Sequence, residues 1–329
     1  MNKILEAKNI QAWYEVRGGL LSRVQGLVRA VDDVSLTIHE GEVVSLVGES
    51  GCGKSTLGLA LLGLLPVREG ELTLFGEKVN YRKNNAWAKH RQKAQMIFQD
   101  PYGSLNPRLT IMEALAEPLL VHGLAKPKEL KDRVAQLLEM VELQPDVMNR
   151  FPHAFSGGQR QRISIARALG MESKLLVCDE IVSALDVSVQ AQVLELLMKL
   201  KKELNLSLLF ISHDLAVVNA ISDRIEVMYL GKIVESGSPD DLLANPQHPY
   251  TNALIEAVPG LDRTKRPKVL GGEIPSPMSR PSGCNFITRC SRKTESCEVP
   301  PDWTFETNKN KSRAYACHHP LTEKVTHDH

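Results

Sequence analysis

A glycine-rich segment early in the chain has the composition of a phosphate-binding loop. Residues 48–56 read GESGCGKST and fit the pattern G-x-x-x-x-G-K-[ST]. The glycines let backbone N–H groups turn toward phosphate oxygens, Lys54 can reach the β- and γ-phosphates, and the hydroxyl of Ser55 can ligate Mg²⁺. The segment follows an apolar strand pattern and opens a helical one, a context that favours nucleotide binding over a chance glycine-rich turn.

Two carboxylates follow a second apolar run. Residues 175–178 read LLVC, and Asp179 and Glu180 come directly after them. In a P-loop fold the first carboxylate holds the Mg²⁺ shell, and the second is placed to polarise an attacking water. A solvated acidic loop after a buried strand is the plainer interpretation, but the phosphate-binding loop in the same chain favours a catalytic pair.

A third segment, SGGQ at residues 156–159, precedes a helical pattern over residues 160–169. Ser156 and Gln159 form the pattern of a capping box, so this segment can be read simply as a helix start. The two glycines leave the helix N-terminus bare, where the positive end of the helix dipole can receive a phosphate.

The elements that must position these groups alternate between strands and helices. The pattern predicts a hairpin over residues 31–47 with a buried second strand, and another hairpin over 225–235. Between them it predicts a helix at 57–65, β structure within 71–98, helices over 106–172, a strand at 175–178, an amphipathic helix at 188–204 and a strand at 208–211. This alternation predicts an α/β fold with a largely parallel sheet.

The motifs, together with Ser183–Asp186 and His213, resemble those of ABC-transporter ATPase subunits in order and spacing over essentially the whole chain. The resemblance implies a P-loop ABC ATPase fold with a mixed sheet core, an antiparallel β subdomain and a helical subdomain at about 106–172. We expect the ATPase cassette to span residues 1–259. From residue 260 the chain is rich in Pro, Gly, Lys and Arg, and we expect a small irregular extension over 260–329.

The same resemblance implies residue roles. Two such subunits, identical or different, would dimerise head to tail, with ATP between the phosphate-binding loop of one and Ser156–Gln159 of the other. Gln99 matches the residue that touches Mg²⁺ or water and reports to the membrane subunits. Glu180 matches the general base, and His213 matches the switch histidine that contacts the γ-phosphate. Asp186 matches the loop that couples the two sites, and Tyr14 (alternatively Trp13) is positioned like the aromatic that stacks on adenine.

The expected site is therefore specified residue by residue. The nucleotide-binding residues are Tyr14, Gly48, Ser50, Gly51, Cys52, Gly53, Lys54, Ser55, Thr56, Gln99, Ser156, Gly157, Gly158, Gln159, Asp179 and Asp186. Mg²⁺ is expected at Ser55, Gln99 and Asp179, and the catalytic groups are Lys54, Gln99, Glu180 and His213.

Four of the six cysteines, Cys284, Cys290, Cys297 and Cys317, lie close to the C-terminus. In a cytosolic chain such a group favours a metal site over disulfides. Their spacing, and the segment at residues 247–251, resemble the oligopeptide, dipeptide and nickel importer branch, in which four thiolates bind a [4Fe–4S] cluster. Zinc, and cysteines that are free or prone to form disulfides, stay as alternatives, although structural zinc usually shows closer cysteine pairs. Residues 183–192 resemble the second of the two ATPase subunits in such importers.

Composition limits the partners. The net charge of +1 gives no basic field for nucleic acid. The N-terminus has no apolar signal-peptide core, and the longest apolar run, around residues 57–67, is shorter than the roughly 20 residues of a membrane span. We expect a soluble, peripheral protein on the cytoplasmic face of the inner cell membrane. It would bind a second ATPase subunit, two permease subunits and, indirectly, an extracytoplasmic substrate-binding protein.

These observations predict an ATP-hydrolysing subunit of an ABC importer for di- and oligopeptides. Oligosaccharides or nickel are alternative cargoes in the same branch. An ABC ATPase acting on DNA or ribosomes is a further alternative, although the interval between Gln99 and Ser156 leaves room only for a helical subdomain. A binder that uses nucleotide merely to switch conformation is the last, and the presence of Glu180 and His213 argues against it.

Overall fold

The computed structural model describes residues 2–18, 23–81, 87–100, 103–258, 271–308 and 311–321. The chain forms two compact units, each assembled from segments that are far apart in the sequence. Unit 1 comprises Met1–Leu5, Ile38–Glu42 and Leu74–Ile211, and unit 2 comprises Glu6–Thr37, Val43–Thr73 and Ser212–His329. The predicted motifs are therefore divided between two bodies.

Unit 1 is built on three parallel strands, β6 (Ala94–Ile97), β7 (Leu175–Asp179) and β8 (Ser207–Ser212). Every residue of β7 and β8 is buried, as expected for strands covered on both faces. The register pairs Ile97 with Cys178, and Asp179 with Ile211. The carboxyl ends of the three strands therefore meet at one edge, where their loops can carry function.

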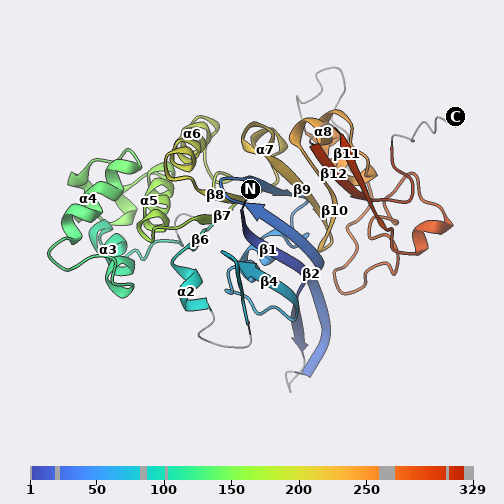
Figure 1. Ribbon diagram of the computed structural model, residues 1–329, viewed down its shortest axis with the longest axis horizontal. Coiled ribbons are helices and arrows are strands. Elements are labelled where there is room, and N and C mark those ends of the chain that lie inside the picture. The colour runs from blue at the N-terminus through green and yellow to red at the C-terminus, as the bar shows by residue number, and fades with distance from the viewer. Residues whose placement is uncertain are drawn as a thin grey trace. The chain divides into compact units, whose positions relative to one another are not determined.

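The helices of unit 1 agree with the prediction for residues 106–172 and 188–204, whereas one short helix, at Ala88–Arg91, lies within the segment predicted as β structure. They are α2 (Ala88–Arg91), α3 (Ile111–Val121), α4 (Leu130–Met140), α5 (Gly157–Gly170) and α6 (Val187–Leu204), with 3-10 turns at Pro145–Asn149 and Pro152–Ala154. Helices α3, α4 and α5 pack against one another, and α5 also packs against α6 (Figure 1).

Helix α6 shows how the sequence specifies an element here. Its buried residues, Val193, Leu196, Leu197 and Leu200, recur at the spacing of one helix face. The helix ends at Asn205, which adopts a left-handed φ of 50° as the C-cap. The amphipathic helix predicted at 188–204 is therefore confirmed.

Unit 2 contains most of the antiparallel structure. Its strands are β1 (Lys3–Gly18), β2 (Arg23–His39), β3 (Val43–Val47), β4 (Glu69–Leu74), β9 (Arg224–Tyr229), β10 (Lys232–Gly237), β11 (Trp303–Asn308) and β12 (Lys311–Ala316). Its helices are α1 (Lys54–Leu61), α7 (Leu215–Ile221), α8 (Pro239–Ala244), α9 (Pro249–Ala257) and a 3-10 turn at Glu295–Glu298. Strand β5 (Glu77–Lys78) is short and belongs to unit 1.

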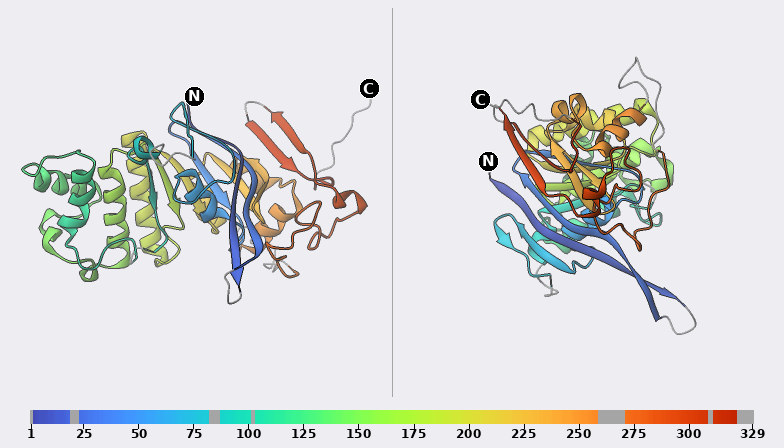
Figure 2. Two further views of the ribbon diagram at one scale, coloured as in Figure 1. Left: turned by 90° about the horizontal axis from the view of Figure 1, so that it is seen from below. Right: turned by 90° about the vertical axis from the view of Figure 1, so that its right-hand side faces the viewer.

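Pairing in unit 2 is mixed. Strand β3 pairs in parallel with β9, while β9 with β10, β10 with β12, and β12 with β11 are antiparallel. Strand β1 lies between β2 and β4 in a separate sheet, and Figure 2 shows β1 and β2 as a long twisted pair. Together with the parallel strands of unit 1, this confirms the predicted α/β class with a mixed sheet.

Two sequence predictions fail in unit 2. The hairpin over residues 31–47 is wrong, because β2 pairs with β1 whereas β3 pairs with β9. The C-terminal part of the chain is not wholly irregular, because β12 adds a strand to the edge of β10, with Glu235 opposite Tyr315. The hairpin over 225–235 is confirmed as β9 and β10.

Within the described ranges, no helix combines the length and the apolar character needed to cross a membrane.

Candidate functional site

The segment at residues 48–56 joins β3 to α1 in unit 2. Gly48 has a φ of 154°, and a Cβ there would lie 2.2 Å from the carbonyl oxygen of Met228. Gly53 has a φ of 110°, and its Cβ would lie 2.1 Å from the carbonyl oxygen of Ala30. Glycine is therefore required at both positions, because the loop is held closely between the backbones of β2 and β9.

Lys54 is the first residue of α1 and is buried. Its ammonium group donates to the carbonyl oxygens of Gly48, at 2.8 Å, and Glu49, at 3.0 Å. The positive charge thus lies over the loop, at the helix end whose N–H groups and dipole favour an anion. Burial raises the pKa of the Cys52 thiol, so Cys52 fills space in the loop as a neutral group. Ser55 follows on α1 and is exposed.

Tyr14 and Trp13 are neighbours on β1 and point to opposite faces of the strand. The hydroxyl of Tyr14 lies 3.4 Å from the hydroxyl oxygen of Thr56 at the end of the loop, and the tyrosine is 39% exposed. The ring of Trp13 is covered by two guanidinium groups, those of Arg29 at 4.8 Å and Arg68 at 4.1 Å. Of the two aromatics, Tyr14 is therefore the one that can offer a ring face beside the loop.

Gln99 and Glu180 meet in unit 1. Both lie two residues beyond the paired Ile97 and Cys178, so the parallel register sets them side by side. The side-chain amide of Gln99 donates to Glu180 at 3.1 Å and lies 3.5 Å from the hydroxyl of Ser183. Two residues that are 81 positions apart in the sequence therefore share one hydrogen bond at the carboxyl edge of the strands.

The backbone around Glu180 is fixed in an unusual conformation. Glu180 has a φ of 48°, its N–H donates to the carbonyl of Ile211, and its own carbonyl accepts from Ser183. A left-handed conformation at a residue other than glycine is costly, and it persists where the surroundings hold it. Asp179, just before it, is buried as the last residue of β7. The two neighbouring carboxylates are thus placed differently, one buried and one at the strand edge.

Residues 156–159 form the capping box that the sequence predicts. Ser156 accepts from the N–H of Gln159, and Gln159 accepts from the N–H of Ser156. Ser156 and Gln159 are exposed, whereas Gly158 is buried. A Cβ at Gly158 would lie 2.3 Å from a methyl group of Val189 on α6. Gly158 is therefore needed for helix packing, and the surface that this helix start offers consists of Ser156, Gly157 and Gln159.

The remaining predicted residues lie at helix starts. Asp186 is the N-cap residue of α6 and is exposed, and the loop before it is organised by Gln190, whose amide donates to two of its carbonyls. His213 is exposed in unit 2, next to Asp214, which caps α7.

The predicted site residues are divided between the two units. Unit 1 carries Gln99, the 156–159 segment, Asp179, Glu180 and Asp186, and unit 2 carries Tyr14, the phosphate-binding loop and His213.

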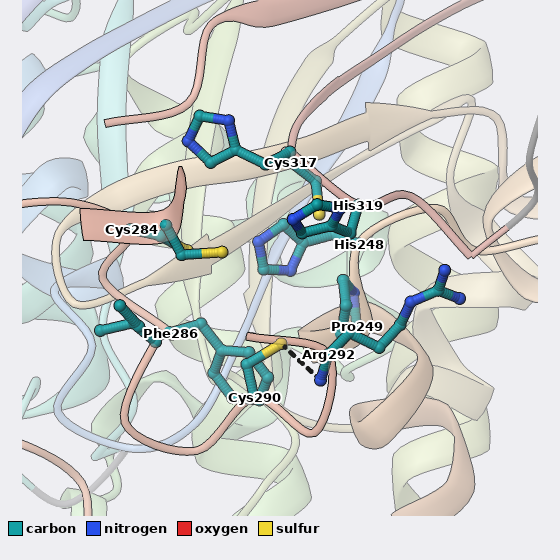
Figure 3. Close-up of a pocket in the computed structure, with 11 residues that line it drawn as sticks. His248, Pro249, Cys284, Phe286, Cys290, Arg292, Cys317 and His319 are labelled. Carbon is teal, nitrogen blue, oxygen red and sulfur yellow. Dashed lines mark hydrogen bonds between the residues drawn. The ribbon is translucent and has the colours of Figure 1, made fainter. Parts of the chain in front are cut away.

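The iron–sulfur prediction for the four C-terminal cysteines is wrong. Cys284, Cys290, Cys297 and Cys317 line one pocket together with His248, His318 and His319 (Figure 3). Among the described residues, however, no group of three or more His, Cys, Asp or Glu side chains is arranged to hold a metal ion. This finding also removes the zinc alternative.

The side chains around this pocket have other environments and partners. Burial raises the pKa of Cys284, Cys290 and Cys317, the last to about 12, so these thiols are neutral in the metal-free chain. The histidines are engaged elsewhere, since His319 bonds Thr294 at 2.6 Å and His318 bonds the carbonyl of Val299 at 2.9 Å. The spacing of the four cysteines along the chain correctly indicated that they share one location. It did not show whether their side chains are arranged to coordinate a metal.

One contact to the loop was missed by the sequence analysis. Both guanidinium nitrogens of Arg289 donate to the carboxylate of Glu49, at 2.6 and 3.0 Å. The N–H of Glu49 donates to the hydroxyl of Tyr250 at 2.8 Å. Burial works against the charge of Arg289, but its hydrogen bonds to Glu49 and Tyr229 outweigh this and raise its pKa. Nothing local in the sequence links residues 240 positions apart.

Two families match separate parts of the chain. Residues 31–183 match the family described as ABC transporter, a range that includes the phosphate-binding loop, Gln99, the 156–159 segment and Glu180. Residues 234–297 match the family described as oligopeptide/dipeptide transporter, C-terminal region.

Similar proteins match over most of their length. The oligopeptide transport ATP-binding protein OppF of Salmonella typhimurium is 49% identical over 294 residues, covering 87% of this chain and 88% of that protein. The oligopeptide transport ATP-binding protein AppF of Bacillus subtilis is 47% identical, covering 87% of this chain and 89% of that protein.

A solved structure supports the same assignment. The ATP-binding cassette MJ0796, in a dimeric post-hydrolysis state bound to ADP and phosphate, aligns with a TM-score of 0.63 and 30% identity. The alignment covers 71% of this chain and 98% of that one. By its motifs, its fold and these relatives, the chain belongs to the ATP-binding subunits of ABC transporters.

Proposed function

We propose that this chain is the ATP-hydrolysing subunit that powers an importer of oligopeptides. Proteins of about this length that are nearly half identical to it are oligopeptide transport ATP-binding proteins. The match at residues 234–297 to an oligopeptide/dipeptide transporter region supports the same cargo class from a separate part of the chain. No observation favours oligosaccharides or nickel over peptides.

In this proposal the loop at residues 48–56 binds the triphosphate and Tyr14 stacks on adenine. The glycine backbone and the buried ammonium of Lys54 fit a phosphate group, because they present N–H donors and positive charge. Ser55, Gln99 and Asp179 would hold Mg²⁺, since hydroxyl, amide and carboxylate oxygens suit that ion. When bound, Mg²⁺ neutralises charge that develops on the phosphates.

The hydrolytic step is assigned to Glu180. Its carboxylate accepts a proton from the water that attacks the γ-phosphate in line, while Gln99 orients the carboxylate or the water. Lys54 stabilises negative charge on the phosphates, and His213 contacts the γ-phosphate. The observation that carries this assignment is the hydrogen bond from Gln99 to Glu180, together with the left-handed backbone that fixes Glu180.

The second half of the site belongs to a partner in this proposal. Ser156, Gly157 and Gln159 of one subunit would cap the ATP held by the loop of the other, and Asp186 would couple the two sites. Gly158 supports that surface through its packing. The dimer, of this chain with itself or with a different ATPase subunit, would bind two permease subunits at the cytoplasmic face of the membrane, and an extracytoplasmic substrate-binding protein would deliver the cargo. We assign the cassette to residues 1–259 and an extension to 260–329.

The test is Glu180→Gln in the assembled transporter. This substitution keeps the size and the hydrogen bond to Gln99 but removes the base, so ATP turnover should fall by at least about 100-fold. Nucleotide binding should persist, because the phosphate-binding loop is unchanged. Glu203→Gln, at an exposed position on α6, is the matched control and should turn over ATP like the wild type. Undiminished turnover by Glu180→Gln would overturn the assignment.

A further inference from the structure

Glu49, the second residue of the phosphate-binding loop, is bound through each of its polar groups. Its N–H donates to the hydroxyl of Tyr250 at 2.8 Å, and its carbonyl accepts from the ammonium of Lys54 at 3.0 Å. Its carboxylate receives the two hydrogen bonds from Arg289. The position of Glu49 therefore fixes one of the two carbonyls that hold Lys54, and Arg289 and Tyr250 fix the position of Glu49.

Arg289 is itself held rigidly. Its side chain is 2% exposed, and its Nε donates to the carbonyl of Gly271 at 3.1 Å. Its guanidinium group lies 6.0 Å from the ring centroids of Tyr229 and Phe286. A planar guanidinium with every nitrogen bonded loses little freedom on binding a carboxylate, so this is a strong and directional contact.

The residues that hold Arg289 also adjoin the loop. The rings of Tyr229, Tyr250 and Phe286 pack together with centroids 4.5 to 5.4 Å apart. Asn285 donates to the carbonyl of Leu230 at 3.3 Å. Gly231, which follows Leu230 in the chain, donates its N–H to the carbonyl of Cys52 in the loop at 2.7 Å. The C-terminal segment 285–289 and the phosphate-binding loop are thus bound to one aromatic cluster.

We propose that Arg289 is a positioning residue for nucleotide binding, acting through Glu49 on the loop and on Lys54. It does so in two ways. The bidentate bond sets the backbone of Glu49, and the guanidinium neutralises a carboxylate that would otherwise repel the triphosphate. The inference rests on the proposed function only in that the loop binds ATP. It assigns to the C-terminal region a direct part in shaping that site.

The experiment measures binding of a fluorescent ATP analogue to the full chain, and kcat and KM for ATP in the assembled transporter. Arg289→Gln should raise Kd and KM about tenfold and leave kcat nearly unchanged. The substitution weakens the binding of the ground state and the transition state equally, and Glu180 is untouched. Adding Glu49→Gln to Arg289→Gln should recover part of the affinity, since it removes the unpaired carboxylate. Arg289→Lys, which keeps the charge but loses the fork, should fall between wild type and Arg289→Gln.

Arg313→Gln is the matched control. Arg313 forms a comparable buried ion pair with Glu235, 2.7 Å long, that joins β12 to β10 without touching the loop. Its loss should lower the thermal midpoint but leave Kd for the nucleotide at the wild-type value. If Arg289→Gln only lowers the midpoint, as Arg313→Gln does, the inference is refuted. If Arg289→Gln does not fold, an unchanged Kd in Arg289→Lys refutes it instead. A wild-type chain that fails to bind the analogue would refute the proposed function, which is a separate outcome.

Discussion

Gly158→Ala tests whether the second glycine of the 156–159 segment serves packing. The added Cβ would lie 2.3 Å from a methyl group of Val189, whereas carbon atoms in contact are about 3.5–4.0 Å apart. Helices α5 and α6 must therefore separate, or Val189 must leave its rotamer, which costs about 1–3 kcal/mol. The better helix propensity of alanine returns up to about 1 kcal/mol. We expect a net loss of roughly 1–2 kcal/mol in the free energy of unfolding.

The assay is a double-mutant cycle with Val189→Ala, scored by thermal unfolding and by ATPase turnover in the assembled transporter. Val189→Ala removes the methyl group that the new Cβ meets, so the double variant should be more stable than the sum of the single changes by about 1 kcal/mol. It should also recover most of the turnover lost in Gly158→Ala. Additive stability effects would refute the packing role. Rescue of stability without rescue of turnover would show that packing alone does not account for Gly158 and would assign it a contact with the nucleotide as well.

Three further predictions concern the loop and its surroundings. Tyr14→Ala should weaken ATP binding roughly tenfold, because stacking on a base contributes about 1–3 kcal/mol, whereas Trp13→Ala should lower the thermal midpoint and spare affinity; equal affinity losses would contradict the assignment. Gly53→Ala should abolish binding in equilibrium titration, since its Cβ would meet the carbonyl of Ala30 at 2.1 Å in a left-handed conformation, and retained affinity would contradict the loop geometry. Burial lowers the pKa of His248 to about 3, from 6.5. The unfolded chain therefore takes up a proton below pH 6.5 that the folded chain does not, and stability should fall toward pH 3 by up to about 1.4 kcal/mol per pH unit. Denaturant titrations should show a weaker pH dependence for His248→Asn, and an unchanged one would argue against a buried neutral imidazole.

The parts of the site that the sequence predicts well are local. The phosphate-binding loop, the capping box and the Asp179-Glu180 pair are each defined by a few adjacent residues, whose backbone conformation follows from glycine, capping and strand patterns. The hydrogen bond between Gln99 and Glu180 was not predicted, because it depends on β6 pairing with β7; once they pair in parallel, the register aligns residues at equal distances beyond the two strand ends.

The parts that failed depend on contacts between distant segments. The alternation over residues 31–47 is the same whether β2 and β3 pair with each other or, as here, with β1 and β9. Cysteine spacing places four thiols in one pocket but does not determine their protonation or geometry. The bond between Arg289 and Glu49, and the need for glycine at position 158 against Val189, depend on which surfaces the fold brings together.

We conclude that this chain hydrolyses ATP to drive peptide import. For the most direct measurement, the transporter is isolated by affinity purification of this chain and reconstituted in vesicles with its substrate-binding protein. ATP hydrolysis and the uptake of a labelled oligopeptide are then followed together. We expect both to occur with the wild-type chain and both to be lost with Glu180→Gln. ATP hydrolysis without peptide uptake, or uptake that survives Glu180→Gln, would contradict this conclusion.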